Sequence, residues 1–179
     1  RLNISRGPLR EAILQLTEEG LLVKEAYRGL RVRSVSRREL SELYSMRTTL
    51  ERFAIEESWD KRTDAALDIL RRRLIRLEQA RTAKDVSAAV DGEIALHSWI
   101  YELSGHSLLK SHWQKLVPLV QIYMSIHNRQ HGVTGVFMDA NHKYVDLMQG
   151  DDRAAILNHI GEHMQKGLDS VYASVEADR

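Results

Sequence analysis

Residues 37–179 are a succession of segments with apolar residues at helical spacing, and this pattern limits the folds open to the chain. No segment alternates apolar and polar residues as a half-buried strand does, and the chain has only two prolines. The first of these helices is expected to begin at Arg37, and the others are expected near 64–82, 85–104, 107–129, 137–149 and 152–175. The sequence therefore predicts an all-α bundle of about six helices, in which inward-facing side chains form the binding sites.

Composition narrows the class of protein further. The chain has 179 residues and no cysteine, which excludes disulfides, thiolate zinc sites and cysteine nucleophiles. No apolar run approaches the ~18 residues of a membrane span, and no signal-peptide pattern opens the chain. We therefore expect a cytoplasmic protein with no membrane partner. Because Arg1 is not an initiator methionine, we expect the natural chain to begin earlier.

The N-terminal segment, residues 1–36, has a different character from the rest. Residues 1–38 contain nine Lys/Arg and four Asp/Glu, a net charge of +5, which leaves −4 for the remainder of a chain of net charge +1. Ser5 is a natural N-cap for a helix that Gly20 would end, and two short alternating segments follow with Gly29 at their turn. A helix followed by a basic hairpin is the second half of a winged helix-turn-helix, which binds DNA.

The same segment resembles the recognition helix and wing of the GntR family of bacterial transcription regulators. The matching residues are Ser5, Arg6, Pro8, Arg10, Glu11, Ala12, Leu16, Gly20, Leu21 and Gly29. Gly7 stands where the family usually has threonine. The resemblance implies that DNA is contacted by Ser5, Arg6, Gly7 and Arg10, and at the wing tip by Arg28 and Gly29. In this family two further helices precede the motif, so residues 1–36 would be the C-terminal part of the DNA-binding domain.

The start of the body, RRELSELYSMRTTLE, resembles the helical FCD domain of the FadR-type branch of that family. The resemblance implies that residues 37–179 form an effector-binding and dimerisation domain, which senses a small carboxylate in a homodimer on an operator. Arg47 lies on the apolar stripe that continues through Leu50 and Ala54, and a buried arginine needs an anion. Glu51, four residues on, is one candidate partner, and a bound effector is the other.

The stretch DGEIALHSWIYELSGH, residues 91–106, carries the strongest metal-ligand pattern. Glu93 and His97 are four residues apart and share one helix face, a spacing that suits two ligands of one ion. His142 and His163 lie in line with apolar residues of the last two helices. The FCD resemblance implies a divalent metal site built from one carboxylate and three histidines, with Glu93 in place of the usual aspartate.

The metal-site pattern leaves the ligands and the metal partly open. Asp91 could replace Glu93, and His159 could replace His163, as ligands. Zinc is the expected metal, with nickel and manganese as alternatives.

The sequence thus predicts a ligand-responsive DNA-binding regulator, a repressor in most members of such a family, and not an enzyme. Two other classes remain open. A metal-dependent hydrolase would use the same histidine and glutamate cluster to activate water, but it would leave the basic hairpin without a role. A helical interaction module would contain the histidines without a metal.

Overall fold

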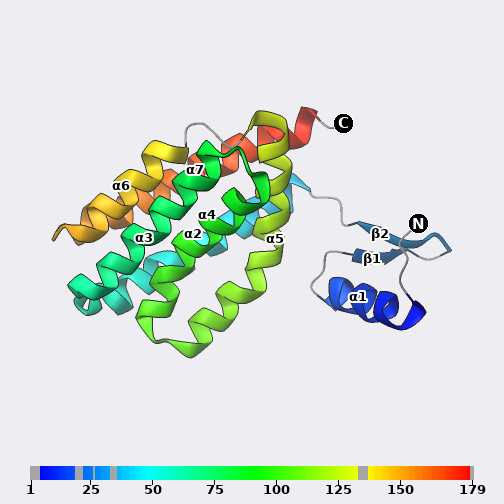
Figure 1. The fold of residues 1–179 in the computed structure, drawn as a ribbon, viewed down its shortest axis with the longest axis horizontal. Coiled ribbons are helices and arrows are strands. Elements are labelled where there is room, and N and C mark those ends of the chain that lie inside the picture. Colours follow the sequence, from blue (N-terminus) through cyan, green and yellow to red (C-terminus); the bar gives the residue numbers. More distant parts are fainter. Residues whose placement is uncertain (1–4, 19–21, 26, 33–35, 133–136, 178–179) are drawn as a thin grey trace. The chain divides into compact units, whose positions relative to one another are not determined.

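Figure 1 shows the computed structural model, which describes the chain except for residues 1–4, 19–21, 26, 33–35, 133–136 and 178–179. The chain divides into two compact units, Arg1–Ser36 and Arg37–Arg179. The elements are, in order, α1 (Arg6–Glu18), β1 (Leu22–Glu25), β2 (Gly29–Val32), α2 (Arg37–Ser58), the 3-10 helix η1 (Trp59–Lys61), α3 (Asp64–Thr82), α4 (Val86–Ser104), α5 (Ser107–His131), α6 (Phe137–Gln149) and α7 (Arg153–Ala177). The predicted fold class, a helix and hairpin followed by a six-helix bundle, is confirmed.

The first unit is one helix followed by an antiparallel hairpin. Pro8 lies in the first turn of α1, where its missing amide hydrogen breaks no helical hydrogen bond. Strands β1 and β2 pair with Leu22 opposite Val32 and Glu25 opposite Gly29. Gly29 has a φ of 84°, a backbone conformation that favours glycine, and it lies where the sequence predicts the turn.

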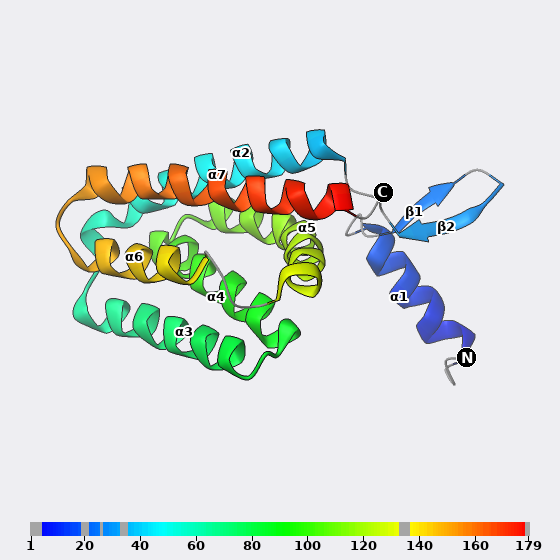
Figure 2. The ribbon, with the colours of Figure 1, turned by 90° about the horizontal axis from the view of Figure 1, so that it is seen from above.

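In the second unit, α4 is the central helix. It packs against α2, α3 and α5, while α7 packs against α2, α5 and α6, and α6 also touches α3. Figure 2 shows α2 and α7 running side by side in opposite directions, with α3 on the far side of α4 and α6 between α7 and α3. Large side chains that are fully buried in this bundle include Tyr101, Trp113, Tyr123, Tyr144, Leu70, Ile100 and Met148.

Helices α3 and α4 approach each other closely at Gly92. A Cβ atom at this position would lie 3.1 Å from the Cα of Leu77, a contact so tight that Leu77 would have to shift by a few tenths of an ångström. Because Arg81 lies one turn after Leu77, and Glu93 directly follows Gly92, this close packing brings Arg81 and Glu93 together in the core.

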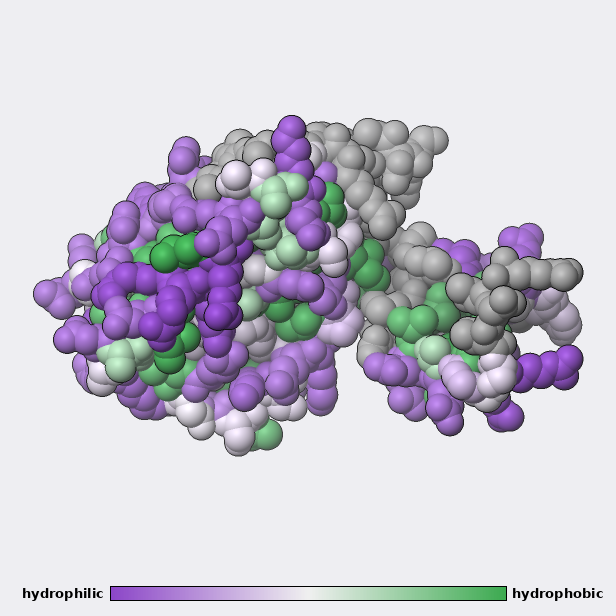
Figure 3. Space-filling view, in the orientation of Figure 1, coloured by the Kyte–Doolittle hydropathy of each residue, from purple (hydrophilic) through white to green (hydrophobic). Residues whose placement is uncertain are grey.

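The surface of the bundle is mainly hydrophilic in the view of Figure 3, with hydrophobic residues scattered among charged ones. A surface hollow of about 600 Å³ lies between α3 and α4, lined by charged residues such as Arg76 and Asp91 and by small ones such as Ala88 and Gly92. Among the residues that the structure describes, no helix is both long enough and apolar enough to cross a membrane.

Candidate metal and effector site

The core of the bundle contains an unusual number of polar side chains for its size. Residues exposed by no more than 6% include Arg47, Glu51, Arg81, Glu93, His97, Asn141, His159 and His163. Each lies in line with the buried apolar residues of its own helix. On α3, for example, Leu67, Leu70, Leu74 and Leu77 recur every three or four positions, and Arg81 is the next residue in that series. Five helices, α2, α3, α4, α6 and α7, thus contribute polar groups to the core.

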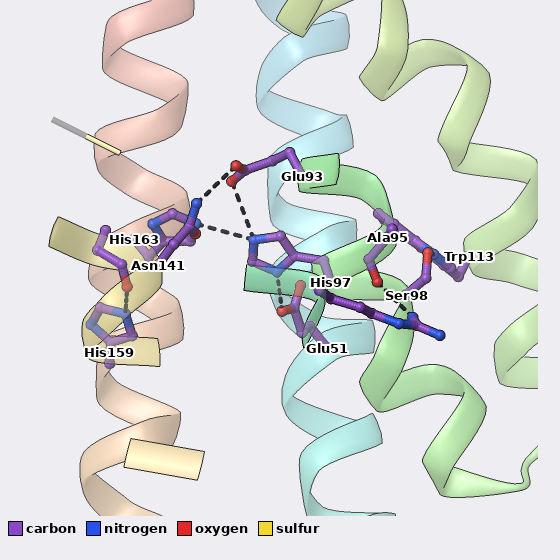
Figure 4. Close-up of polar contacts among 11 residues, drawn as sticks. Glu51, Glu93, Ala95, His97, Ser98, Trp113, Asn141, His159 and His163 are labelled. Atoms are coloured by element: carbon purple, nitrogen blue, oxygen red, sulfur yellow. Dashed lines mark hydrogen bonds and ion pairs between the residues drawn. The ribbon is translucent and has the colours of Figure 1, made fainter. Parts of the chain in front are cut away.

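Three of these residues form a cluster with the composition of a metal site. Glu93, His97 and His163 are all buried, and one potential ligand atom from each lies within 4.8 Å of the others. The His97 Nε2 atom lies 3.3 Å from His163 Nε2 and 3.6 Å from Glu93 Oε1. Helix α4 supplies the first two residues from consecutive turns of one face, and α7 supplies the third, as Figure 4 shows.

His97 is held in place by Glu51 of α2. Its Nδ1–H donates to Glu51 Oε1 at 2.5 Å, which fixes the ring so that Nε2 faces Glu93 and His163. Burial alone would lower the pKa of His97, but the carboxylates of Glu51 and Glu93 outweigh burial and raise it to about 9. Without a bound cation, His97 is therefore an imidazolium at neutral pH.

Glu93 is bound by groups from two other helices. Its Oε2 accepts hydrogen bonds from Arg81 Nη2 of α3 and from Asn141 Nδ2 of α6, both at 2.8 Å. Burial would raise the pKa of this carboxyl, but the neighbouring His97 and Arg81 lower it to about 2. Glu93 is therefore a carboxylate throughout the physiological range, as a metal ligand must be.

His163 and His159 stand one turn apart on α7, and only His163 reaches the cluster. Burial and the positive charge of His97 lower the pKa of His163 to about 3, so its imidazole is neutral. The Nε2 atom of His159 lies 2.9 Å from the carbonyl oxygen of Ala140 on α6, and burial lowers the pKa of this histidine as well. Of the two predicted alternatives for the last helix, the structure brings His163 to the cluster.

Two of the candidate metal ligands lie elsewhere. His142 is exposed, and its Nε2 atom lies 2.7 Å from Glu78 Oε1 at the surface, so the structure places it away from the cluster to which the sequence assigns it. One residue turns a helix by about 100°, and the neighbouring Asn141 occupies the inward position instead. Asp91 is also exposed, and it lines the surface hollow between α3 and α4, so the structure brings Glu93 and not Asp91 to the cluster.

Arg47 lies in an aromatic part of the same core. Its guanidinium carbon is 5.5 Å from the ring centroids of both Tyr44 and Trp113, and Trp113 in turn stacks on Tyr101 at 4.8 Å. The first candidate partner of Arg47 does not pair with it, because the hydrogen-bonded partner of Glu51 among the described residues is His97. The Nε atom of Arg47 is buried and has no hydrogen-bond partner within the described ranges.

Other buried polar atoms of the bundle share this lack of a partner. In the described part of the chain, buried atoms without a hydrogen bond include Glu51 Oε2, Arg81 Nη1, Tyr101 OH, Asn141 Oδ1 and Tyr144 OH. Tyr101 and Tyr144 interact electrostatically with each other and with Glu51, and burial raises the pKa of both phenols well above its usual range. Buried polar groups are normally paired, so this concentration marks a region suited to a polar ligand.

The predicted DNA-contacting residues lie on the surface of the first unit. Ser5, Arg6, Gly7 and Arg10 are exposed at the start of α1, and Arg28 and Gly29 are exposed at the hairpin turn. The hairpin is supported by an ion pair between Arg31 Nε and Glu25 Oε1 at 2.6 Å. The basic side chains at the start of α1 are therefore free to meet a polyanion.

Comparison with known proteins identifies the family. The FCD domain matches residues 42–166. The chain is 35% identical over 80 residues to the Nta operon transcriptional regulator of Aminobacter aminovorans, a match that covers 45% of this chain and 38% of that protein. It is 22% identical over 179 residues to the gluconate operon transcriptional repressor of Bacillus licheniformis, which covers 97% of this chain and 72% of the repressor.

A solved structure has the same fold. A putative GntR transcriptional regulator from Rhodococcus sp. RHA1 superimposes with a TM-score of 0.74 at 21% identity, over 99% of this chain and 83% of the other. This likeness extends the match across both units, and the FCD match covers most of the second. The chain belongs to the FCD-domain family, within the GntR-type transcription regulators.

Proposed function

We propose that the protein is a DNA-binding transcription regulator whose helical domain holds a divalent metal ion and responds to a small carboxylate. The observation that carries this proposal is the buried cluster of Glu93, His97 and His163, next to the buried guanidinium of Arg47. The relatives named as transcriptional regulators and repressors support a regulatory role and give no support to an enzymatic one. We further propose that it acts in the cytoplasm as a homodimer on a two-fold symmetric operator.

The DNA-binding part of the proposal rests on the first unit. A helix followed by a hairpin, with exposed arginines at the helix start, is the arrangement in which a winged helix-turn-helix reads the major groove. Arginine suits this role because its two parallel N–H groups can bind guanine O6 and N7 together. Arg6 and Arg10 are four residues apart and share a face of α1, so both can reach one groove.

Replacing Arg10 by alanine is expected to weaken operator binding by roughly 5- to 150-fold, which corresponds to about 1–3 kcal/mol for one bidentate base contact. The operator would be selected from random oligonucleotides with the full-length protein, and affinity would be measured by fluorescence anisotropy at several salt concentrations. Arg72→Ala, an exposed arginine of α3 in the other unit, is the matched control and should leave affinity unchanged. Equal binding by the Arg10 variant and the control would contradict the assignment of α1 as the recognition helix.

The metal part of the proposal depends on the chemistry of the donors. One carboxylate and two imidazoles are ligands that zinc accepts. Glu51 accepts the other ring N–H of His97, as a carboxylate commonly does for a metal-bound histidine, and so fixes the orientation of the ring. Zinc is therefore the metal we propose, with nickel and manganese as alternatives. The ion would supply a positive centre at which a carboxylate oxygen of the effector binds.

The charges of the buried groups favour an anionic effector. The guanidinium groups of Arg47 and Arg81 balance the carboxylates of Glu51 and Glu93, so the protein itself contributes no net charge when both imidazoles are neutral. A divalent ion would then leave two uncompensated positive charges in a buried region, and such charges require an anion. The free hydrogen-bonding capacity of Arg47 Nε and of the Tyr101 and Tyr144 hydroxyls suits carboxylate oxygens.

Replacing Arg47 by methionine is expected to abolish stabilisation by carboxylates in the zinc-loaded protein. A ligand at about a hundredfold excess over its Kd adds roughly 2.7 kcal/mol, or about 5–10 °C in Tm for a domain of this size. The probes would be lactate, malonate, succinate and citrate in a thermal-shift assay. Arg52→Met, an exposed position on the same helix, should respond as the wild type does. A full response in the Arg47 variant would show that the carboxylate binds elsewhere.

A further inference from the structure

The side-chain amide of Asn141 in α6 has a hydrogen-bonded nitrogen and an oxygen without a partner. Its Nδ2 donates to Glu93 Oε2 at 2.8 Å, and its Oδ1 is buried without a hydrogen bond. The residue is fully buried, with a relative exposure of 0%. A carboxylate can only accept hydrogen bonds, so the amide must present its nitrogen to Glu93 and its oxygen to another group. A buried acceptor without a partner is costly, so this oxygen is in a position that a ligand would relieve.

Asn141 lies beside a cluster that lacks a fourth protein ligand. Figure 4 shows Asn141 next to His163 and facing Glu93 and His97. The three clustered residues supply three ligands, whereas a zinc ion can take four protein ligands and expand to five-coordinate, which leaves a position for the effector. The sequence assigns the remaining place on α6 to His142, but that imidazole is at the surface with Glu78. Asn141 is the residue of α6 that reaches the cluster.

We propose that Asn141 Oδ1 is a fourth protein ligand of the divalent ion held by Glu93, His97 and His163. This inference rests on the proposed metal site. The resulting donor set has two oxygens and two nitrogens, and the amide oxygen adds no charge. Carbonyl and carboxylate oxygens suit manganese better than imidazole does, so Asn141 makes the site more tolerant of manganese than a three-histidine site would be. Asn141 is thus a determinant of the metal selectivity of this site.

Metal titrations of the full-length protein test the assignment. Affinities for Zn²⁺ and Mn²⁺ would be measured by competition with a chelating dye for the wild type, Asn141→Ala, Asn141→Asp and Asn141→His. Asn141→Ala is expected to weaken both metals by at least about tenfold. Asn141→Asp keeps an oxygen donor but loses the N–H that Glu93 accepts, so it should bind at least as tightly as the wild type. Asn141→His should raise the preference for Zn²⁺ over Mn²⁺ by at least about tenfold, because imidazole suits zinc better.

The matched control is His142→Ala, which alters the adjacent and exposed side chain and should leave both affinities unchanged. If Asn141 only positioned Glu93, then Asn141→Asp would lose affinity as Asn141→Ala does, and the inference would be overturned. A crystal structure of the zinc-loaded wild type gives a direct answer, since a ligating Oδ1 must lie about 2.0–2.2 Å from the ion.

The outcomes also separate this inference from the proposed function. An Oδ1 atom beyond bonding distance of a bound zinc ion would overturn the role of Asn141 and leave the metal site intact. Binding of neither Zn²⁺ nor Mn²⁺ by the wild type would overturn both the metal site and the role of Asn141.

Discussion

Replacing Arg81 by methionine is expected to lower the free energy of unfolding of the metal-free protein by about 3–5 kcal/mol, since it removes one partner of a buried ion pair. Arg81 Nη2 lies 2.8 Å from Glu93 Oε2, and the two side chains are exposed by only 7% and 4%. Urea denaturation in the presence of a chelator measures the loss. A divalent cation should return much of it, because the ion would replace the guanidinium as the counter-charge of Glu93.

Two further variants define what the Arg81 result means. The double variant Arg81→Met with Glu93→Gln should lose less than Arg81→Met alone, because it removes both members of the buried ion pair. Arg71→Met on the same helix removes an ion pair with Asp68 whose side chains are 42% and 53% exposed, and this should cost no more than about 1 kcal/mol. Equal losses in the Arg71 and Arg81 variants would contradict a stabilising role for the buried pair.

The helical architecture could be predicted because it depends on local patterns. Apolar residues at intervals of three and four define each helix face, and glycines such as Gly105, with a φ of 67°, end them. The predicted helix 64–82 matches α3 at both ends, and 85–104 differs from α4 by one residue. The pairing of Glu93 with His97 follows from the same rule, because residues four apart share a helix face.

The orientation of α6 could not be predicted as well. His142 is expected to face inward because it lies three residues before Val145. The buried positions are instead Asn141, Tyr144, Val145 and Met148, which form a stripe centred about 100° away from His142. A polar residue contributes nothing to an apolar pattern, so the sequence alone does not indicate that Asn141 belongs to the buried face.

Glu51 and Arg81 show what the sequence missed and which signal could have found them. Both are charged residues in line with the apolar stripe of their helix. Arg47 is identified from the sequence as a buried charged residue by this rule, but the rule is not applied to Glu51 or Arg81. The pattern reveals that such a side chain is buried, but the identity of its partner depends on how the helices pack. By sequence, Glu51 is one of two candidate partners of Arg47, and in the structure it binds His97, 46 residues away.

Replacing His97 by glutamine is expected to lower the affinity for divalent cations at least about a hundredfold, more than the loss of an outer partner causes. His97 is the member of the cluster closest to both others, with Nε2 at 3.3 Å from His163 Nε2 and 3.6 Å from Glu93 Oε1. Glutamine is chosen because its amide can keep donating to Glu51, which avoids a second unpaired carboxylate. Dye competition and calorimetry measure the change, with His159→Ala as the control on α7.

The pH dependence of binding gives this prediction a second and independent readout. Glu51 and Glu93 raise the pKa of His97 to about 9 despite its burial, so at pH 7 a metal ion must displace a proton from this imidazole. Wild-type affinity should therefore rise about tenfold per pH unit from pH 6.5 to 8, with about one proton released per ion bound. The glutamine variant has no such proton, and its remaining affinity should be nearly independent of pH in this range.

Because His159 binds the Ala140 carbonyl, its replacement should preserve both the affinity and the proton release. If the His159 variant lost the proton release and the His97 variant kept it, the metal ligand that gives up the proton would have to be His159 and not His97.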